Sequence, residues 1–246
     1  MPDASNAPAL RLTDIRKEFS GLVAIENCSL AIEAGEIVAL VGDNGAGKST
    51  LVKIIAGVHP PTAGTIEFGG KTVQPTTDAN RNDVEVVYQD LALADQQPVY
   101  MNLFLGREKT KRPLGLLDRR GMIDEAQALV SQLDVRIPSV TATIRDLSGG
   151  QRQGVAIARA FHWAKRIVLL DEPTAALGVA ETARVEEIIK TLRTQNLAIL
   201  IISHSLDQVF RLADRICVLR RGSQVGIRRT SETDKNEIVS MITGLA

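Results

Sequence analysis

The sequence feature that most constrains the fold is the nine-residue segment GDNGAGKST at 42–50, which fits the phosphate-binding pattern G-x-x-x-x-G-K-[ST]. The apolar, β-branched run Ile37–Val41 precedes it and predicts a buried strand. Apolar residues at helical spacing follow it, and Gly57 marks the expected end of that helix. A strand, a glycine-rich turn and a helix N-terminus together present backbone N–H groups to an anion. The segment is therefore predicted to bind phosphate, and the alternative is a glycine-rich turn without a ligand.

Two side chains of this segment have the chemistry that a nucleotide phosphate requires. The Lys48 ammonium would add a positive charge at the β- and γ-phosphates, and the Ser49 hydroxyl would be a ligand for Mg²⁺. The nucleotide-binding residues predicted in this segment are Gly42, Asp43, Asn44, Gly45, Ala46, Gly47, Lys48, Ser49 and Thr50.

Composition limits the class of protein. The 246 residues can form one large α/β domain or one domain with a sizeable insertion, and 29 basic residues balance 29 acidic ones, so no net charge attracts nucleic acid. Cys28 and Cys217 lie far apart in apolar runs and are predicted to be buried free thiols. Residues 1–8 carry no signal pattern, and no apolar stretch approaches the ~20 residues that span a bilayer. We therefore expect a soluble chain.

Apolar segments divide the chain into an α/β pattern with one interruption. Segments 9–15, 28–32 and 64–70 predict strands, and four further runs that do not alternate with polar residues predict buried parallel strands: Val84–Tyr88, Ile167–Leu170, Leu197–Ile202 and Ile216–Leu219. No strand is predicted between about Leu91 and Phe161, where helices are expected at 101–105, at 119–133 and from Gly149 onward. A helical block is thus predicted to be inserted in a mostly parallel sheet.

An acidic pair, Asp171 and Glu172, ends one of the predicted buried strands. Ligands of parallel sheets lie at this carboxyl edge. Asp171 fits the acid that supports Mg²⁺ in phosphoryl-transfer enzymes, and Glu172 could polarise an attacking water. The alternative is a solvated pair of carboxylates.

Three further constellations could contribute to a phosphate site. Serine and glycines precede a predicted helix at Ser148, Gly149, Gly150 and Gln151, which is either a second anion site or a plain helix cap. Gln89 ends a predicted strand, where its amide could meet Mg²⁺ or water. His204 follows the strand at 197–202 and would lie near the phosphates, although a lone histidine is more often structural.

In order and approximate spacing, GDNGAGKST, Gln89, LSGGQ, the Val168–Glu172 segment and His204 resemble the motifs of ATP-binding cassette (ABC) ATPases. The resemblance runs from about Leu10 to Gly222, and LSGGQ is specific to that family. It implies an α/β P-loop fold at 9–226, with an N-terminal antiparallel β-subdomain, a helical subdomain at about 91–161 and a short tail at 227–246. It also implies that Phe19 stacks on adenine, unless Phe19 merely covers the sheet edge.

The same resemblance implies a mechanism. Two cassettes pair head to tail, and ATP lies between the phosphate loop of one and the LSGGQ segment of the other. Glu172 would polarise the water, Lys48 and His204 would contact the γ-phosphate, and the metal ligands would be Ser49, Gln89 and Asp171. Gly178 departs from the family, which usually carries an aspartate there. Either backbone groups communicate across the dimer here, or the two sites are coupled more loosely.

The segments around Gln89, Asn102–Glu108 and Glu172–Val179 resemble the carbohydrate-importer branch. This similarity implies a single cassette at the cytoplasmic face of a membrane, bound to two permease subunits and served by a periplasmic or extracellular sugar-binding protein. Two alternatives stay open: a soluble ABC ATPase of DNA repair or translation, and an assembly protein that binds ATP but barely hydrolyses it.

Overall fold

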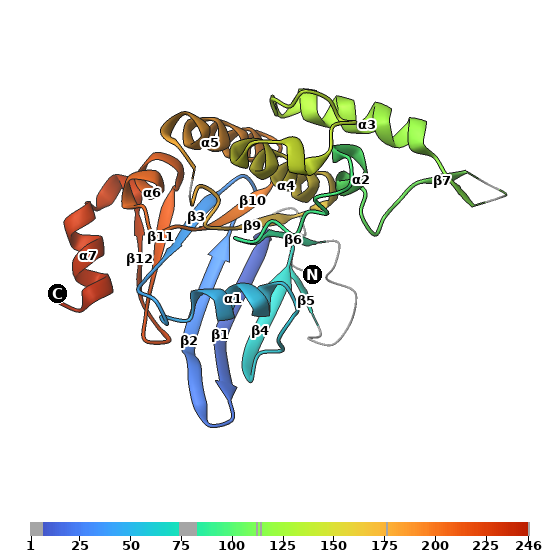
Figure 1. Cartoon of the computed structure of the whole chain (residues 1–246). Coiled ribbons are helices and arrows are strands. Elements are labelled where there is room, and N and C mark those ends of the chain that lie inside the picture. The colour runs from blue at the N-terminus through green and yellow to red at the C-terminus, as the bar shows by residue number, and fades with distance from the viewer. Residues whose placement is uncertain (1–6, 74–82, 112, 114, 176, 246) are drawn as a thin grey trace. The chain divides into compact units, whose positions relative to one another are not determined.

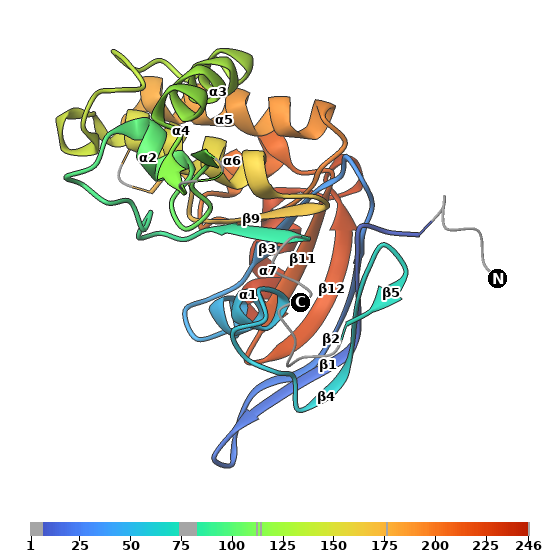
Figure 2. The same cartoon turned by 90° about the vertical axis from the view of Figure 1, so that its right-hand side faces the viewer.

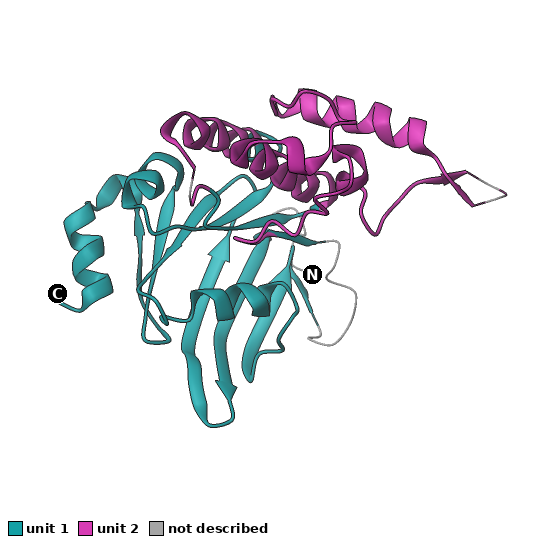
Figure 3. Ribbon diagram, viewed as in Figure 1, with its two compact units in different colours: residues 1–86, 164–173, 192–246 teal, residues 87–163, 174–191 magenta. Residues whose placement is uncertain are grey.

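The computed structural model describes residues 7–73, 83–111, 113, 115–175 and 177–245, and the chain forms two compact units (Figure 3). Unit 1 comprises Met1–Val86, Ala164–Pro173 and Leu192–Ala246, and unit 2 comprises Val87–Trp163 and Thr174–Thr191. Unit 2 therefore interrupts the sequence of unit 1 twice. Most of the N-terminal segment 1–8 lies outside the described residues.

Unit 1 is built on a ten-stranded sheet of the order β5-β4-β1-β2-β12-β11-β3-β10-β9-β6 (Figure 1). In its core, β10 is parallel to β3 and β9, and β11 is parallel to β3. The N-terminal strands are antiparallel, and Figures 1 and 2 show β1, β2 and β4 side by side. The strands are β1 (Leu10–Phe19), β2 (Leu22–Ile32), β3 (Ile37–Val41), β4 (Ala63–Phe68), β5 (Lys71–Thr72), β6 (Val84–Val87), β9 (Ile167–Asp171), β10 (Ala198–Ile202), β11 (Arg215–Arg220) and β12 (Ser223–Arg229).

The central strands are buried on both faces. Every residue of β3 and β10 is buried, which is why their sequences are continuous apolar runs rather than alternating ones. Unit 1 also contains the helices α1 (Lys48–Ile55), α6 (Leu206–Leu212) and α7 (Lys235–Thr243). The predicted α/β class and the predicted parallel core are confirmed, and Cys28 and Cys217 are buried free thiols as expected.

Unit 2 is helical, with α2 (Val99–Leu103), α3 (Arg119–Gln132), α4 (Gly149–Trp163) and most of α5 (Val179–Thr194). Helices α2, α3 and α4 pack on one another. The prediction that 91–161 holds no strand is wrong, because β7 (Thr110–Lys111) pairs with β8 (Leu116–Leu117). Strands of two residues are too short to produce an alternating pattern, so periodicity cannot detect them.

Four elements of unit 1, namely β5, α6, β12 and α7, were not predicted. β12 contains no buried residue, and α7 buries only Ile238 and Met241, so neither has a strong apolar pattern. α7 nevertheless contacts β11 and β12, which ties the C-terminal segment to the sheet. Among the helices that the structure describes, none has the length and apolar character needed to cross a membrane.

Candidate nucleotide site

The phosphate-binding loop connects β3 to α1, and its shape depends on glycine. Gly42, Gly45 and Gly47 have φ angles of +152°, +80° and +104°, a region that other residues rarely adopt. A Cβ atom at Gly42 would lie 2.1 Å from the Leu219 carbonyl oxygen of β11. Only glycine therefore lets the loop approach β11 this closely, and Gly47 sets the direction in which α1 begins at Lys48.

Replacing Gly42 by alanine should destabilise the fold by more than about 3 kcal/mol, because backbone strain and a clash with backbone act together. Gly45→Ala is the matched control: its φ is also positive, but nothing lies within 4 Å of the added Cβ. The control should lose only about 1–2 kcal/mol. Urea unfolding of the two variants measures the difference, and equal losses would contradict the proposed close approach.

The Lys48 side chain folds back over the loop. Its Nζ donates hydrogen bonds to the carbonyl oxygens of Gly42, at 2.6 Å, and of Asp43, at 2.9 Å. Lys48 is only 8% exposed, so it is a buried cation at the head of a helix. Burial lowers the pKa of Lys48, and the charges of Glu172, Asp43 and Asp171 oppose that shift.

The acidic pair lies at the carboxyl edge of the sheet, as predicted. Asp171 ends β9 directly beside Ile202 of β10, so the residues that follow the two strands are neighbours. Glu172 Oε1 lies 3.0 Å from His204 Nε2, an ion-pair distance, yet this buried oxygen has no aligned hydrogen-bond donor. Glu172 also has a φ of +53°, a strained conformation for a non-glycine residue.

Burial governs the electrostatics of both carboxylates. It raises the pKa of Asp171, against the opposing charges of Lys48 and His204. It also raises the pKa of Glu172, and His204 is the main opposing charge. A partly desolvated carboxylate with an oxygen that accepts no hydrogen bond is suited to accept a proton from water. Unit 1 thus brings together four of the predicted residues: Lys48, Asp171, Glu172 and His204.

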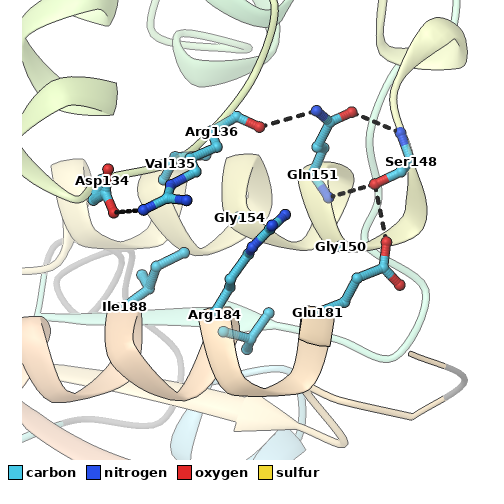
Figure 4. Close-up of a pocket in the computed structure, with 11 residues that line it drawn as sticks. Asp134, Val135, Arg136, Ser148, Gly150, Gln151, Gly154, Glu181, Arg184 and Ile188 are labelled. Atoms are coloured by element: carbon cyan, nitrogen blue, oxygen red, sulfur yellow. Dashed lines mark hydrogen bonds and ion pairs between the residues drawn. The ribbon is translucent and has the colours of Figure 1, made fainter. Parts of the chain in front are cut away.

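The LSGGQ segment begins α4 in unit 2 and forms a reciprocal helix cap. Ser148 Oγ accepts a hydrogen bond from the Gln151 backbone N–H at 3.3 Å, and Gln151 Oε1 accepts one from the Ser148 N–H at 2.9 Å. Gln151 Nε2 donates to the Arg136 carbonyl oxygen at 2.9 Å (Figure 4). These hydrogen bonds cap the first turn of α4. Both a second anion site and a plain helix cap would show them, so they do not distinguish the two.

The remaining predicted residues lie at exposed positions. Phe19 ends β1, is 38% exposed, and packs edge-on against His59, with Lys17 Nζ 4.7 Å from its ring centre. Gln89 follows β6 and belongs to unit 2, where it is exposed. One residue that contacts the LSGGQ segment was missed, namely Glu181, whose carboxylate accepts a hydrogen bond from Ser148 Oγ. Its only local signal is an acidic side chain in the first turn of α5.

A glycine-rich loop that opens a helix, a buried lysine and two carboxylates at the end of another strand of the same sheet define a nucleotide-binding protein of the P-loop class. Over residues 25–175 the chain matches the family described as ABC transporter. The chain therefore belongs to the ABC transporter family, and it is an ATP-binding ATPase subunit of the ABC type.

Three relatives of this chain are sugar import ATP-binding proteins. The chain is 43% identical to the xylose/arabinose import ATP-binding protein XylG of Sulfolobus acidocaldarius, over 96% of this chain and 94% of that protein. It is 38% identical to the fructose import ATP-binding protein FrcA of Rhizobium meliloti, with the same coverage of 96% and 94%. It is 42% identical to a ribose import ATP-binding protein of Burkholderia mallei, of which it spans 46% of the length.

Solved structures support the fold. The cbiO1 protein from Clostridium perfringens, part of an ABC transporter complex, superimposes with a TM-score of 0.82 at 23% identity, covering 98% of this chain and 96% of that one. A dimeric ATP-binding cassette bound to ADP and Pi in a post-hydrolysis state superimposes with a TM-score of 0.76 at 24% identity, covering 90% and 98%. At these identities the likeness establishes the ABC cassette fold.

Proposed function

We propose that this chain is the ATP-hydrolysing subunit that powers import of a sugar or similar small solute through a membrane ABC transporter. The observation that carries the proposal is the 43% identity with a xylose/arabinose import ATP-binding protein along nearly the full length of both chains. The arrangement of Lys48, Asp171, Glu172 and His204 supports hydrolysis as the source of power. The names of the relatives do not favour a soluble ABC ATPase of DNA repair or translation.

We assign the roles in hydrolysis as follows. Glu172 accepts a proton from the attacking water, while Lys48 and His204 hold the γ-phosphate. Phe19 stacks on adenine. The backbone of 42–50 surrounds the phosphates, and two copies of the chain pair so that Ser148, Gly149, Gly150 and Gln151 of one copy contact the nucleotide held by the other.

We further propose that Mg²⁺ accompanies the nucleotide, held by Ser49, Gln89 and Asp171. The donor set fits a hard cation, because a hydroxyl, an amide and a carboxylate all offer oxygen. Within the described residues no group of three or more His, Cys, Asp or Glu side chains could hold a metal alone. Mg²⁺ in phosphoryl-transfer sites is bound by few protein ligands together with phosphate oxygens and water, and here it would neutralise phosphate charge.

The proposed organisation follows from the same role. We place an ABC ATPase domain at 9–226, with a helical subdomain at about 91–161 and a tail at 227–246. The partners are a second cassette, two permease subunits and, indirectly, a sugar-binding protein outside the membrane. The chain would then lie on the cytoplasmic face of the membrane, attached through its permease partner.

Co-expression with the permease subunits tests this function. The chain should co-purify with them in detergent, and reconstituted vesicles should accumulate one sugar in an ATP-dependent manner. A chain that hydrolyses ATP but never binds a permease would contradict the transport role.

The residues after Gln89 form the proposed permease-binding surface. They fall into two groups that differ in how deeply their side chains are buried. Val99, Leu103 and Phe104 are fully buried core residues, whereas Leu91, Leu93 and Met101 are half-buried. Leu93→Asp should therefore leave ATP binding by the isolated chain nearly intact and abolish assembly with the permease. Pull-down and uptake assays measure this, with Val225→Asp as the control at an exposed apolar position of β12. Normal transport by Leu93→Asp would place the binding surface elsewhere.

A further inference from the structure

Glu181 joins two segments of unit 2 that lie far apart in the sequence. Its Oε1 accepts a hydrogen bond from the Ser148 hydroxyl at 3.1 Å (Figure 4). Its Oε2 accepts one from the Gly178 N–H at 3.4 Å. Ser148 caps α4, and Gly178 directly precedes α5. One carboxylate thus connects the LSGGQ segment with the loop that follows the Asp171–Glu172 pair.

The Ser148 hydroxyl has no spare hydrogen for another acceptor. It carries one proton, which it donates to Glu181, and one lone pair accepts the N–H of Gln151 at 3.3 Å. A phosphate oxygen can therefore accept a hydrogen bond from the Ser148 hydroxyl only if it replaces Glu181 as the acceptor.

Packing holds the Glu181 side chain in this position. A Cβ atom built at Gly150 would lie 3.0 Å from both Cβ and Cγ of Glu181, so the glycine makes room for the side chain directly over the first turn of α4. Figure 4 shows the Glu181 carboxylate pointing at Ser148 from the opposite helix. The negative charge therefore lies at the helix N-terminus, where an anion is stabilised.

We propose, on the basis of the proposed ATP-sandwich function, that Glu181 is a positioning residue that competes with the γ-phosphate of the partner's ATP for the Ser148 proton. In the nucleotide-free chain Glu181 orients Ser148. When the second cassette brings its ATP to α4, Ser148 changes acceptor, and Glu181 keeps only its contact with Gly178. Closure of the dimer is thereby coupled to Gly178, the position that lacks the aspartate usual in the family.

Glu181→Gln removes the negative charge but keeps a side-chain oxygen that can accept a hydrogen bond. Glutamine in the first turn of a helix can cap it as glutamate does, so folding should be unchanged. The neutral amide oxygen of glutamine accepts a weaker hydrogen bond from a hydroxyl than a carboxylate does. The γ-phosphate should therefore replace it more easily as the acceptor of the Ser148 hydrogen bond. In the full chain carrying Glu172→Gln, the ATP concentration that gives half-maximal dimerisation in size-exclusion chromatography should fall about threefold to tenfold.

Glu187→Gln is the matched control, because Glu187 is an exposed residue of the same helix paired with Lys190 at 2.8 Å. It should leave the half-maximal concentration unchanged. ATP binding to the separated chain, measured by calorimetry, should be equal in all variants. In a Ser148→Ala background, Glu181→Gln should lower the half-maximal ATP concentration much less, because the hydroxyl for which the two acceptors compete is absent.

Three results would overturn the inference. An unchanged or raised half-maximal concentration in Glu181→Gln would leave Glu181 with a capping role only. If Glu181→Gln lowered the half-maximal ATP concentration equally in the Ser148→Ala background, the Glu181 charge would act independently of Ser148. Absence of any ATP-dependent dimer in the parent Glu172→Gln chain would instead reject the proposed sandwich, and the inference with it.

Discussion

Replacing Glu172 by glutamine should reduce ATP hydrolysis by about 10²–10⁴-fold while ATP binding stays close to that of the wild type. The amide has the shape of the carboxylate but cannot take a proton from water. The buried Oε1, which accepts no hydrogen bond, is the atom that would accept this proton, and Lys48 remains in place to bind phosphate. The variant should therefore accumulate as an ATP-bound dimer, which size-exclusion chromatography detects.

The pH dependence provides a second test of the same role. Because burial raises the pKa of Glu172, wild-type activity should fall on acidification at a higher pH than an ordinary glutamate would produce. The residual activity of Glu172→Gln should lack this acidic limb. Because the folded-state pKa of Glu172 is raised, the free energy of unfolding should fall as the pH rises from the ordinary glutamate pKa to the raised one, and the loss is complete above the raised pKa.

Thermal unfolding therefore serves as the control for Glu172→Gln. Above the raised pKa the variant should melt no earlier than the wild type, since it removes a desolvated charge. Glu232→Gln, at an exposed carboxylate, should change neither melting nor turnover. Near wild-type hydrolysis by folded Glu172→Gln would remove Glu172 from the role of base.

The core of the fold was predictable because its sequence signal is strong. β3 and β10 are buried along their whole length, so each appears as an uninterrupted apolar run with clear ends. β12 and α7 lie at the surface of unit 1, where few side chains are buried, and their patterns are correspondingly weak. Packing against β11 rather than local preference determines these two elements.

The sequence indicates single residues of the candidate site but not how they pair in space. The motif and the strand ends indicated Lys48, Glu172 and His204, yet the contact between Glu172 and His204 depends on the register of β9 against β10. The Ser148–Glu181 hydrogen bond joins positions 33 residues apart, and no periodic pattern predicts such a contact. The positive φ of Glu172 likewise comes from tertiary structure, since glutamate does not favour it.

Replacing Lys48 by alanine should weaken ATP binding by about tenfold to a hundredfold, the loss expected when a charged hydrogen-bond donor to phosphate is deleted. Lys48 is buried against the loop, so alanine also removes the donor to the Gly42 carbonyl oxygen, whereas the Asp43 carbonyl oxygen keeps the Ala46 N–H at 3.1 Å. Lys48→Met keeps most of the side-chain volume and guards against a loss caused by misfolding. Lys53→Ala, at an exposed lysine of the same helix, is the control and should bind ATP normally.

The lysine variants also test how the charges of the site are linked. The ammonium of Lys48 lowers the pKa of both Asp171 and Glu172, partly offsetting the effect of burial. In Lys48→Met both carboxylates should therefore titrate at still higher pH, so the acidic limb of any residual hydrolysis should move upward. Calorimetric titration with ATP, repeated across pH, measures affinity and proton uptake together. Unchanged ATP affinity in folded Lys48→Met would contradict the assignment of 42–50 as the phosphate-binding loop. Reduced affinity with an unshifted acidic limb would mean that the Lys48 charge does not affect the pKa values of the two carboxylates.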